Sequence, residues 1–505
     1  MTDSSKKQET IRLIFGLKLK QTRAEKGMTQ AALSKQTGIS VSYLNEIEKG
    51  KKYPKPDKIF ALADALDLDY DTMVSLKLDK KLAPIAELIN SNILHELPLD
   101  MFGISINNLF ELLSNAPAQL SAFISTIIEI GRNYDMGVEH FYFSALRTYQ
   151  EMHENYFPEL EEQASEFLKA FNLENRPMIY CEDLEQVLKE KYKYQIDEAL
   201  LPQKKVFKDI RSLVIPGSVP RLLLNDHLLE SQRAFILGRE IGYQFMKLEE
   251  RTYSSMLHDI KSFDQVLNHF KASYFSSAIL IRLHEFVRDL KETFMESFWD
   301  ENMLLKLMLK YNSTPEMFLQ RLTNVAPKFF GMHELFFLRF SHKDNTDLYH
   351  LTKEMHLSGL HNPHAIASNE HYCRRWISLS IFKELESLKK TKAYDRPLVR
   401  TQISDYVDSD NQYLIISMAR AKGEGSEVNS SISVGFKLNE NLKRKVKFSR
   451  DKDIPRKIVS ETCERCPIAD CKERVAEPIV LREKASAEAL KDAIDELTGG
   501  QDLIN

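Results

Sequence analysis

The chain has 505 residues with 43% hydrophobic and 28% charged side chains, which indicates a soluble globular protein of roughly two to four domains. No apolar run reaches the ~20 residues that span a bilayer, and the N-terminal MTDSSKKQET lacks the apolar core of a signal peptide. We therefore expect a cytoplasmic protein. Five cysteines exclude a scaffold built on disulfides.

The net charge of −4 is unevenly distributed along the chain. Residues 1–80 hold 15 Lys and Arg against 11 Asp and Glu, and residues 6–60 hold 13 against 5. A local basic stretch is what contact with phosphates requires, and an acidic remainder keeps the rest of the molecule from coating DNA. The same stretch also suits a solvated helical face, so charge alone does not decide between the two.

Residues that cap or end helices divide residues 11–75 into short helical segments. The dividing residues are Gly27, Thr29, Gly38, Ser40, Gly50 and Pro56. Two helices of about nine residues joined by a turn that contains Gly38 match the helix-turn-helix plan.

The stretch GMTQAALSKQTGISVSYLNEIEKGKKYP resembles the Cro/CI (XRE-type) repressor domains, over about residues 11–76. The resemblance implies a five-helix bundle whose third helix lies in the major groove of DNA. It implies base-edge contacts from Val41, Ser42, Asn45 and Glu46, and phosphate contacts from Ser40, Tyr43, Lys49, Lys51 and Lys52.

Three further positions match polar positions of the same family. Gln30 matches the polar anchor at the start of the second helix and is expected among the residues that contact DNA, whereas Arg23 and Glu48 match a structural pair that ties the first helix to the third. The third helix carries no Arg, so bidentate reading of guanine is not predicted. The alternative to a DNA-binding domain is a helical bundle that is used only for protein contacts.

Residues 80–200 are expected to be predominantly helical. PAQLSAFISTIIEIGR, FPELEEQASEFLKAFNL and CEDLEQVLKEKY repeat apolar residues at steps of three and four. The aromatic stretch VEHFYFSALRTYQEMHENYF either lines a ligand cavity or fills a core.

Around residues 192–224 the pattern changes to short strands, YKYQI, RSLVIP and PRLLLN, which the helix ESQRAFILGREIGYQFMKL follows. The region 160–290 resembles the ImmA/IrrE metallopeptidases, whose active members carry HExxH on that helix. Here the five positions read Arg239, Glu240, Ile241, Gly242 and Tyr243. Since Arg cannot bind zinc, the resemblance implies a peptidase fold without peptidase chemistry. We expect Glu240 to form a buried ion pair with an Arg such as Arg239 or Arg233, and a small effector to occupy the vacated pocket.

Seven of the fourteen histidines lie between His333 and His371, with His361 and His364 three residues apart. This density suits either a metal site or ordinary surface imidazoles.

Near the C-terminus, Cys463, Cys466 and Cys471 have the spacing of metal-binding thiolates, and Cys373 is the candidate fourth ligand. Cys181, at a helix start, is interpreted as a small hydrophobe. The spacing alone favours structural zinc, with an iron–sulfur cluster and free thiols as alternatives.

Together these elements resemble the short-chain fatty acyl regulators, which combine an XRE-type reader, an ImmA/IrrE-like middle and a C-terminal cysteine domain. The segments that carry the resemblance are HYCRRW, ISVGFKLNENLKRKVKFSRD and CERCPIADCKERV with its trailing Arg474. The resemblance implies sensing of acyl-CoA and a [4Fe-4S] cluster on the four cysteines. The loop before Cys373 departs from the family's Gly-rich, Pro-containing pattern, which leaves the ligand set open.

We predict a mainly α protein with a smaller α+β part, which binds double-stranded DNA as a homodimer under the control of a small effector and has no enzymatic activity. The alternatives are a peptidase fused to a DNA reader, disfavoured by the missing HExxH, and an antitoxin-like or phage-type module. The predicted domains are a five-helix reader at 1–78, a helical connector and dimerisation region at 79–157, a degenerate ImmA/IrrE-like domain at 158–312 and an α+β cysteine domain at 313–505.

Overall fold

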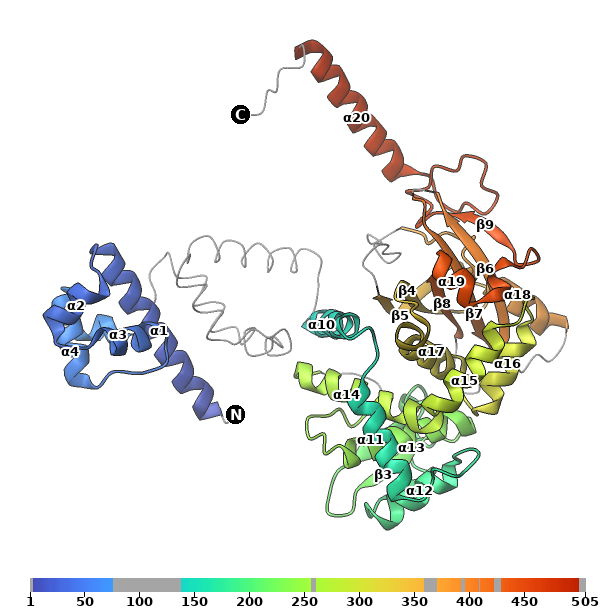
Figure 1. The fold of residues 1–505 in the computed structure, drawn as a ribbon, viewed down its shortest axis with the longest axis horizontal. Helices are drawn as coiled ribbons and strands as arrows, with labels where there is room; N and C mark the ends of the chain where they lie inside the picture. The colour runs from blue at the N-terminus through green and yellow to red at the C-terminus, as the bar shows by residue number, and fades with distance from the viewer. Residues whose placement is uncertain are drawn as a thin grey trace. The chain divides into compact units, whose positions relative to one another are not determined.

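A computed structural model gives the fold of the protein (Figure 1). It describes residues 3–75, 138–255, 260–357, 370–391, 396–407, 409–421 and 428–498. The chain forms two compact units, residues 1–145 with 261–263, and residues 146–260 with 264–505. The helix predicted over 117–132, and most of the predicted connector, lie outside the described residues. The domain boundaries predicted from the sequence stay predictions.

The N-terminal part of the first unit is a bundle of helices, as predicted. The helices are α1 (Asp3–Glu25), α2 (Gln30–Thr37), α3 (Val41–Glu48), α4 (Pro56–Ala65) and α5 (Tyr70–Val74). Helix α1 begins well before the residue-11 start that the sequence suggested. Apolar side chains from all five helices form one core, which includes Leu19, Leu33, Leu44, Leu62 and Met73.

The middle of the chain combines helices with a small sheet. Its elements are α10 (Val138–Met152), α11 (Pro158–Ala170), α12 (Cys181–Glu190), β1 (Gln195–Asp197), β2 (Ser212–Ile215), β3 (Arg221–Leu224), α13 (Glu230–Phe245) and α14 (Phe263–Leu280). The strands follow the order β1-β3-β2, with β1 parallel and β2 antiparallel to β3. The predicted strand segments and the long helix after them are confirmed.

A six-stranded sheet forms the C-terminal part, in the order β5-β4-β8-β7-β6-β9. Its strands are β4 (Leu335–His342), β5 (Tyr349–Leu357), β6 (Leu398–Tyr406), β7 (Gln412–Arg420), β8 (Asn429–Lys437) and β9 (Arg456–Val459). The helices of this part are α15 (Leu283–Phe294), α16 (Glu301–Lys310), α17 (Pro315–Phe330), α18 (Ile377–Thr391), α19 (Glu440–Lys445) and α20 (Ile479–Thr498). The predicted α+β character of this region is confirmed.

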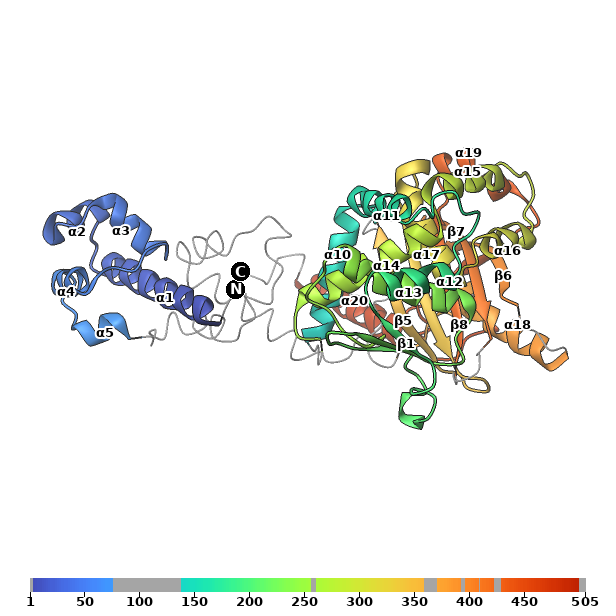
Figure 2. The same ribbon diagram turned by 90° about the horizontal axis from the view of Figure 1, so that it is seen from below.

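The two faces of this sheet are covered by different helices (Figures 1 and 2). Alternate residues of β4 show the division, since Leu335 and Phe337 join the core formed with α15–α17, while Phe336 and Phe340 join Trp376 on the side of α18. Neighbouring residues of β4 join different cores because successive side chains of a strand point to opposite faces of the sheet. None of the described helices is long and apolar enough to cross a membrane.

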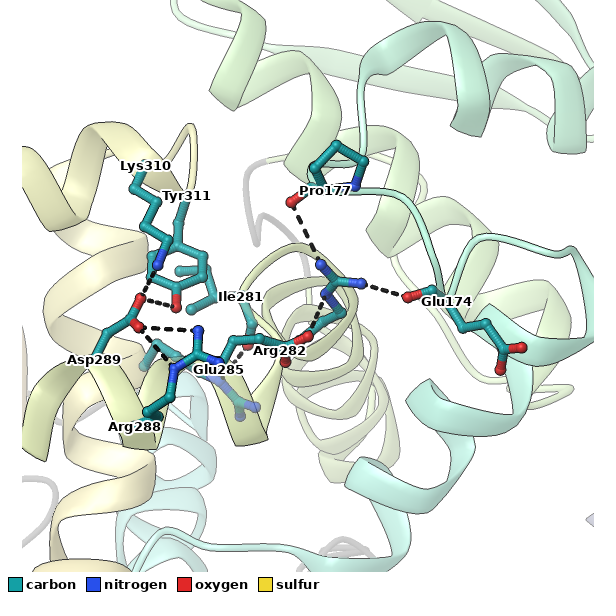
Figure 3. A network of polar contacts seen from close by, with 10 residues as sticks. Glu174, Pro177, Ile281, Arg282, Glu285, Arg288, Asp289, Lys310 and Tyr311 are labelled. Atoms are coloured by element: carbon teal, nitrogen blue, oxygen red, sulfur yellow. Dashed lines mark hydrogen bonds and ion pairs between the residues drawn. The ribbon is translucent and has the colours of Figure 1, made fainter.

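Helices α15 and α16 are joined by a polar network (Figure 3). The Asp289 carboxylate accepts hydrogen bonds from Lys310 and from the Tyr311 hydroxyl at 2.7 Å, and it pairs with Arg288 at 3.2 Å. At the start of α15, Arg282 donates to the carbonyls of Glu174 and Pro177, at 2.7 and 3.4 Å. The network therefore ties α15 both to α16 and to the loop that follows α11.

A buried ion pair joins residues 160 positions apart. Arg321 of α17 is 0% exposed, and its guanidinium donates to the two carboxylate oxygens of Glu161 of α11 at 2.5 and 2.8 Å. The Arg321 Nε donates to the Ile281 carbonyl at 3.0 Å, and the Tyr274 hydroxyl donates to Glu161 at 2.7 Å. Burial raises the pKa of Glu161, but the Arg321 charge and these hydrogen bonds outweigh it, so the net shift is downward.

We expect Arg321→Met to lower the free energy of unfolding by about 3–5 kcal/mol at pH 7, because it leaves Glu161 buried and unpaired. The control Arg288→Met should lower the free energy of unfolding far less, because Arg288 is 61% exposed and Asp289 keeps its other partners. Urea unfolding measures both.

The pH dependence of the same variants tests the cause. Since the pKa of Glu161 is lowered on folding, its stabilisation is present above the ordinary carboxyl pKa and is lost as the pH falls through the lower, folded-state pKa. In Arg321→Met, Glu161 is neutral once it is protonated and then needs no guanidinium. The difference in unfolding free energy between the wild type and Arg321→Met should therefore narrow between pH 7 and pH 4. A gap that is independent of pH would contradict the assigned ion pair.

Candidate nucleic-acid interface

Helices α2 and α3 form a helix-turn-helix with the predicted caps. The Thr29 hydroxyl accepts a hydrogen bond from the Ala32 N–H at 3.1 Å, and the Ser40 hydroxyl accepts one from Tyr43 N–H at 3.3 Å. Gly38 ends α2 with φ 71°, a left-handed conformation that favours glycine. The caps define both helix starts, and the glycine defines the turn between them.

The predicted structural pair of Arg23 and Glu48 forms, and Gln30 joins it. Arg23 donates from Nε to Oε1 of Glu48 at 2.6 Å and from the guanidinium to Oε2 at 3.0 Å. A third bond runs from Arg23 to the Met28 carbonyl at 2.7 Å, and the Gln30 amide donates to Glu48 at 2.8 Å. The carboxylate of α3 is thereby bound to α1 and to the first residue of α2. Gln30, predicted at the DNA, also orients α3 from within the domain.

Helix α1 approaches α3 closely at one glycine. A Cβ atom at Gly16 would lie 2.3 Å from the Ile47 carbonyl oxygen and 3.0 Å from that of Glu48. This approach buries Ile47 and Leu44 completely, since each is 0% exposed. The packing leaves the opposite face of α3 to solvent.

The residues predicted at base edges are found on that face. Val41 (43% exposed), Ser42 and Asn45 are exposed. Glu46 is half-buried, and its carboxylate lies 3.7 Å from Lys52 Nζ, so the structure pairs a predicted base contact with a predicted phosphate contact.

The other predicted phosphate contacts flank α3. Ser40 and Lys51 are exposed at its two ends, and Lys49 is half-buried. Tyr43 packs partly against the core, and Lys58 Nζ lies 4.3 Å from the centre of its ring. Sequence reasoning missed Lys58, because α4 carries it and only the packing of α4 brings it to α3.

In the second unit, Glu240 is held by an unpredicted partner. Arg251 donates to both carboxylate oxygens at 2.7 and 2.6 Å, and the Tyr194 hydroxyl donates at 2.6 Å. The expected buried ion pair of Glu240 with an Arg is confirmed. The suggested partners, Arg239 and Arg233, are wrong, since Arg251 takes this place and Arg233 pairs with Glu185 and Glu198. Arg251 comes from the loop after α13, and its planar guanidinium can donate two parallel hydrogen bonds to a carboxylate. With its oxygens so engaged, Glu240 is not placed to activate water.

Arg239 lies at the first position that was compared with HExxH. Its only described polar side-chain contact is with the Ser212 hydroxyl, at 3.5 Å. The hydroxyl of Tyr243, at the last position, lies 3.3 Å from His269 Nδ1. The Arg251 guanidinium lies over the Tyr243 ring, 3.9 Å from the ring centre. These two side chains occupy the positions that the sequence comparison matched with the histidines of HExxH.

The fold brings Cys373 beside the CxxC segment. An antiparallel bridge pairs Tyr372 with Thr462, flanked by hydrogen bonds from Cys373 N–H to the Glu461 carbonyl at 3.0 Å and from Cys463 N–H to the His371 carbonyl at 2.9 Å. Burial, above all, raises the pKa of the Cys373 thiol to about 11, and the nearby thiols of Cys463 and Cys466 add to the rise.

The four cysteines do not share one environment. Cys373, Cys463 and Cys466 are each 6% exposed, whereas Cys471 is half-exposed. In the part of the chain that the structure describes, no three His, Cys, Asp or Glu side chains are arranged to hold a metal ion. Cys181 is buried at the start of α12, which agrees with its interpretation as a small hydrophobe.

Two residues near the cysteines fix the loop that carries them. The Arg474 guanidinium donates to the carbonyls of Cys463 (2.8 Å), Cys466 (3.0 Å) and Ile468 (2.7 Å). The Glu464 carboxylate binds the ring and the backbone N–H of His371, at 2.7 and 2.9 Å. This pairing of His371 was not predicted.

The other histidines show no clustering among the described residues. His333 pairs with Glu154 at 2.8 Å, and His342 pairs with Glu386 at 2.9 Å. His361 and His364 lie outside the described residues.

Comparisons with known proteins match the N-terminal part. A helix-turn-helix family model matches residues 19–72. The uncharacterized HTH-type transcriptional regulator YazB of Bacillus subtilis is 40% identical over 60 residues, which cover 12% of this chain and 87% of YazB. The corresponding regulator y4dJ of Sinorhizobium fredii is 31% identical over 65 residues, which cover 13% of this chain and 84% of y4dJ.

A solved structure described as a Mycobacterium tuberculosis transcriptional regulator matches 66% of this chain and 93% of that chain. The TM-score is 0.47, and the sequence identity is 17%.

We expect Gly16→Ala to destabilise the N-terminal helices by about 2 kcal/mol, because the added methyl group meets the backbone of α3. In an ordinary helix interior the same change stabilises by about 0.5–1 kcal/mol. The control Gly217→Ala, whose Cβ would find no atom closer than 3.9 Å, should be nearly neutral. Thermal unfolding and protease resistance of the full chain measure the effect. Unchanged stability in Gly16→Ala would contradict the close packing of α1 on α3.

Proposed function

This chain belongs to the XRE-type helix-turn-helix transcriptional regulators, and from this premise we propose that α3 reads a specific DNA sequence under the control of a metabolite. The observation that carries the proposal is the orientation of α3, whose apolar face and Glu48 are buried while Val41, Ser42 and Asn45 are exposed. A recognition helix needs this arrangement, because its free side chains must reach base edges in the major groove. In this proposal the regulator acts in the cytoplasm.

In this proposal the cations around α3 contact the DNA backbone. Lys49, Lys51 and Lys52 follow the end of α3, and Lys58 is added to them by its position over Tyr43. Phosphate contacts position the reader, whereas Ser42 and Asn45 contribute hydrogen bonds that depend on sequence. The Glu46–Lys52 pair must open or turn if both residues contact DNA.

The protein binds DNA as a homodimer in this proposal. Helix-turn-helix readers of this size commonly pair on a two-fold site, where the half-sites lie about one turn of DNA apart. The predicted dimerisation region, residues 79–157, lies mostly outside the described residues.

The effector is proposed to be a short-chain acyl-CoA that binds in the middle region, and this rests on family resemblance. The β1-β3-β2 sheet followed by α13 suits the proposed ImmA/IrrE-like fold. The engagement of Glu240 by Arg251 and Tyr194 supports a binding role over proteolysis.

The cysteine domain is proposed to hold a thiolate-bound centre, a [4Fe-4S] cluster or zinc. The donor chemistry fits, since three buried thiols lie on two paired segments and Arg474 braces the loop. As they stand, the described side chains are not arranged to hold an ion, so the thiols must draw together and Cys471 must move inward to complete the set. A cluster would supply a redox-sensitive centre, and zinc a structural one.

We expect Ser42→Glu to abolish sequence-specific binding, because a carboxylate on the exposed face of α3 would meet the negative edge of the DNA groove. The control Lys26→Gln changes the net charge by the same unit at the turn after α1, where Lys26 pairs with Asp67 at 3.5 Å. Genomic fragments bound by the wild type are isolated first, and the affinity of each variant for them is then measured at two salt concentrations.

Two results of this experiment separate the possibilities. Loss of binding in Ser42→Glu, with normal thermal stability and normal binding by Lys26→Gln, supports α3 as the reader. Normal affinity in Ser42→Glu would falsify the assignment.

We expect protein purified without oxygen to contain either about four irons and four sulfides per chain or one zinc. The variant Cys466→Ser should lose the metal, whereas Cys181→Ser should keep it, because Cys181 lies in α12 and is hydrogen-bonded to Glu230. Elemental analysis and a visible spectrum distinguish the two centres. A wild type without metal, or equal metal in both variants, would rule out the thiolate centre.

A further inference from the structure

The C-terminal sheet presents cations on one face at one end. On β4, β5 and β7 the residues Phe337, Met355 and Met418 belong to the core that α17 covers. Arg339, Lys353 and Arg420 lie two residues away on the same strands, and alternation puts them on the same face. Arg339 and Lys353 are direct partners in the register of β4 and β5. The end of this face therefore collects three positive charges.

Two more cations reach this place from the middle region. Arg239 of α13 lies beside Ser212, and Arg211 is the residue before it on the chain. The charge of Arg339 acts on Arg211, and the charge of Arg211 acts on both Arg239 and Arg420. We call Arg211, Arg239, Arg339, Lys353 and Arg420 the cationic cluster.

Among the described residues, Glu316 is the carboxylate that forms ion pairs with the cationic cluster. Glu316 lies 3.3 Å from Arg339 and 3.5 Å from Lys353. Burial raises the pKa of Glu316, but the charges of Arg339, Lys353 and Arg211 hold it at about 2. The charge of Glu240 also acts on Arg239, but Glu240 is already paired with Arg251. Within the described residues, five cations therefore share one carboxylate that is not paired elsewhere.

Two members of the cluster, Arg211 and Arg420, make no side-chain hydrogen bond or ion pair among the described residues. Arg420 is half-buried, whereas Arg211 is exposed and is attracted by Glu316. Arg239, whose described side-chain contact is with the Ser212 hydroxyl, is half-buried like Arg420. Burial lowers the pKa of the Arg420 guanidinium, and the charge of Arg211 lowers it further.

The pKa of His269 is affected by the same positive charges. Burial first, and then the charges of Arg239, Lys353 and Arg251, hold its pKa well below the usual range. At neutral pH this imidazole is therefore uncharged and adds no further cation to the site.

Partly buried charges without counter-charges are unfavourable, and proteins normally pair them. A bound anion would supply the missing negative charge, and planar guanidinium groups are suited to phosphate oxygens. We propose that the cationic cluster is a binding site for a multiply charged phosphate group, either free or part of a nucleotide-containing effector.

This inference rests on the proposed function in one respect, since it locates the charged part of the effector in the middle region. Arg239 and Tyr243 occupy the positions compared with the zinc ligands of HExxH, so the anion would bind beside the helix that carries peptidase chemistry elsewhere. The site would thus join α13 to the C-terminal sheet through the ligand. Binding would hold these two parts of the second unit together.

A second basic surface provides the comparison. Ser297, Phe298, Lys443, Arg444, Lys447 and Arg450 line a cleft near α19. Arg444 and Lys447 are exposed to solvent. Water solvates these charges, and Asp451 and Asp453 line the same cleft, so the cations there need no bound anion.

The test uses the full chain and two double variants that each remove two positive charges. Arg239→Gln/Arg420→Gln alters two half-buried members of the cationic cluster that have no ion-pair partner among the described residues, and Arg444→Gln/Lys447→Gln alters the cleft near α19. Inorganic pyrophosphate and an acyl-CoA are titrated at constant ionic strength, with calorimetry for affinity and thermal unfolding for stability.

We expect pyrophosphate to bind the wild type and the cleft variant equally. The cluster variant should bind it at least tenfold more weakly, because each lost charge-assisted hydrogen bond is worth roughly a factor of ten. Without ligand, the cluster variant should unfold at the same temperature as the wild type or higher, because repulsion has been relieved. A structural role for the two arginines predicts a lower temperature instead.

The outcomes distinguish this inference from the proposed function. Pyrophosphate binding that depends on the cluster, without binding of acyl-CoA, supports the site and contradicts the acyl-CoA effector. Acyl-CoA binding that survives in the cluster variant supports the effector and overturns the site. Loss of binding in the cleft variant alone, or no binding of either ligand to the wild type, also overturns the site.

Discussion

Arg321 has no exposed surface, and its charge is compensated by a single carboxylate from a helix far away in the sequence. A buried guanidinium with a bidentate partner tolerates little displacement, since any separation leaves two charges in a medium of low dielectric. The pair therefore fixes α17 against α11, and the Ile281 carbonyl adds the end of α14. Because α17 also packs on the sheet core, this one contact sets how the middle of the chain meets the C-terminal sheet.

The same helix carries Glu316 one and a half turns before Arg321. The ion pair that immobilises α17 thus also places the one carboxylate that faces Arg339 and Lys353. The two sites differ in how completely their positive charges are compensated. Arg321 is completely buried and fully paired, whereas the cationic cluster is partly open and holds more positive charge than it can compensate. A fully paired buried site stabilises the fold, and an unbalanced site favours a ligand.

The sequence predicted those features that depend on neighbouring residues. The caps at Thr29 and Ser40, the turn at Gly38 and the strand–helix order before α13 follow from local side-chain chemistry and spacing. The pairing of Arg23 with Glu48 was also expected, because family resemblance supplied a contact that spacing alone does not contain. Local periodicity gave no means of finding Arg251 for Glu240, because a loop turns back to deliver it.

Contacts between residues far apart in the sequence were missed for the same reason. Glu161 and Arg321 lie on helices whose sequences look ordinary, and the cationic cluster draws on segments that span more than two hundred residues. Cys373 was assigned to the other cysteines by the family, and the physical cause is a short bridge between two loops. Charge and residue type are visible in a sequence, but their convergence is decided by tertiary packing.

The distribution of charge explains why two positive regions can coexist in an acidic protein. Beside α3, Lys51 and Lys52 are exposed, so a rigid DNA duplex can reach them, and each keeps its hydration until DNA binds. In the cationic cluster, Arg239, Arg339 and Arg420 are half-buried, and a duplex as wide as DNA cannot insert among side chains from a helix and three strands. Only a small anion can compensate charges in that position. The degree of burial therefore assigns the two regions to different partners, DNA for the first and a phosphate-bearing small molecule for the second.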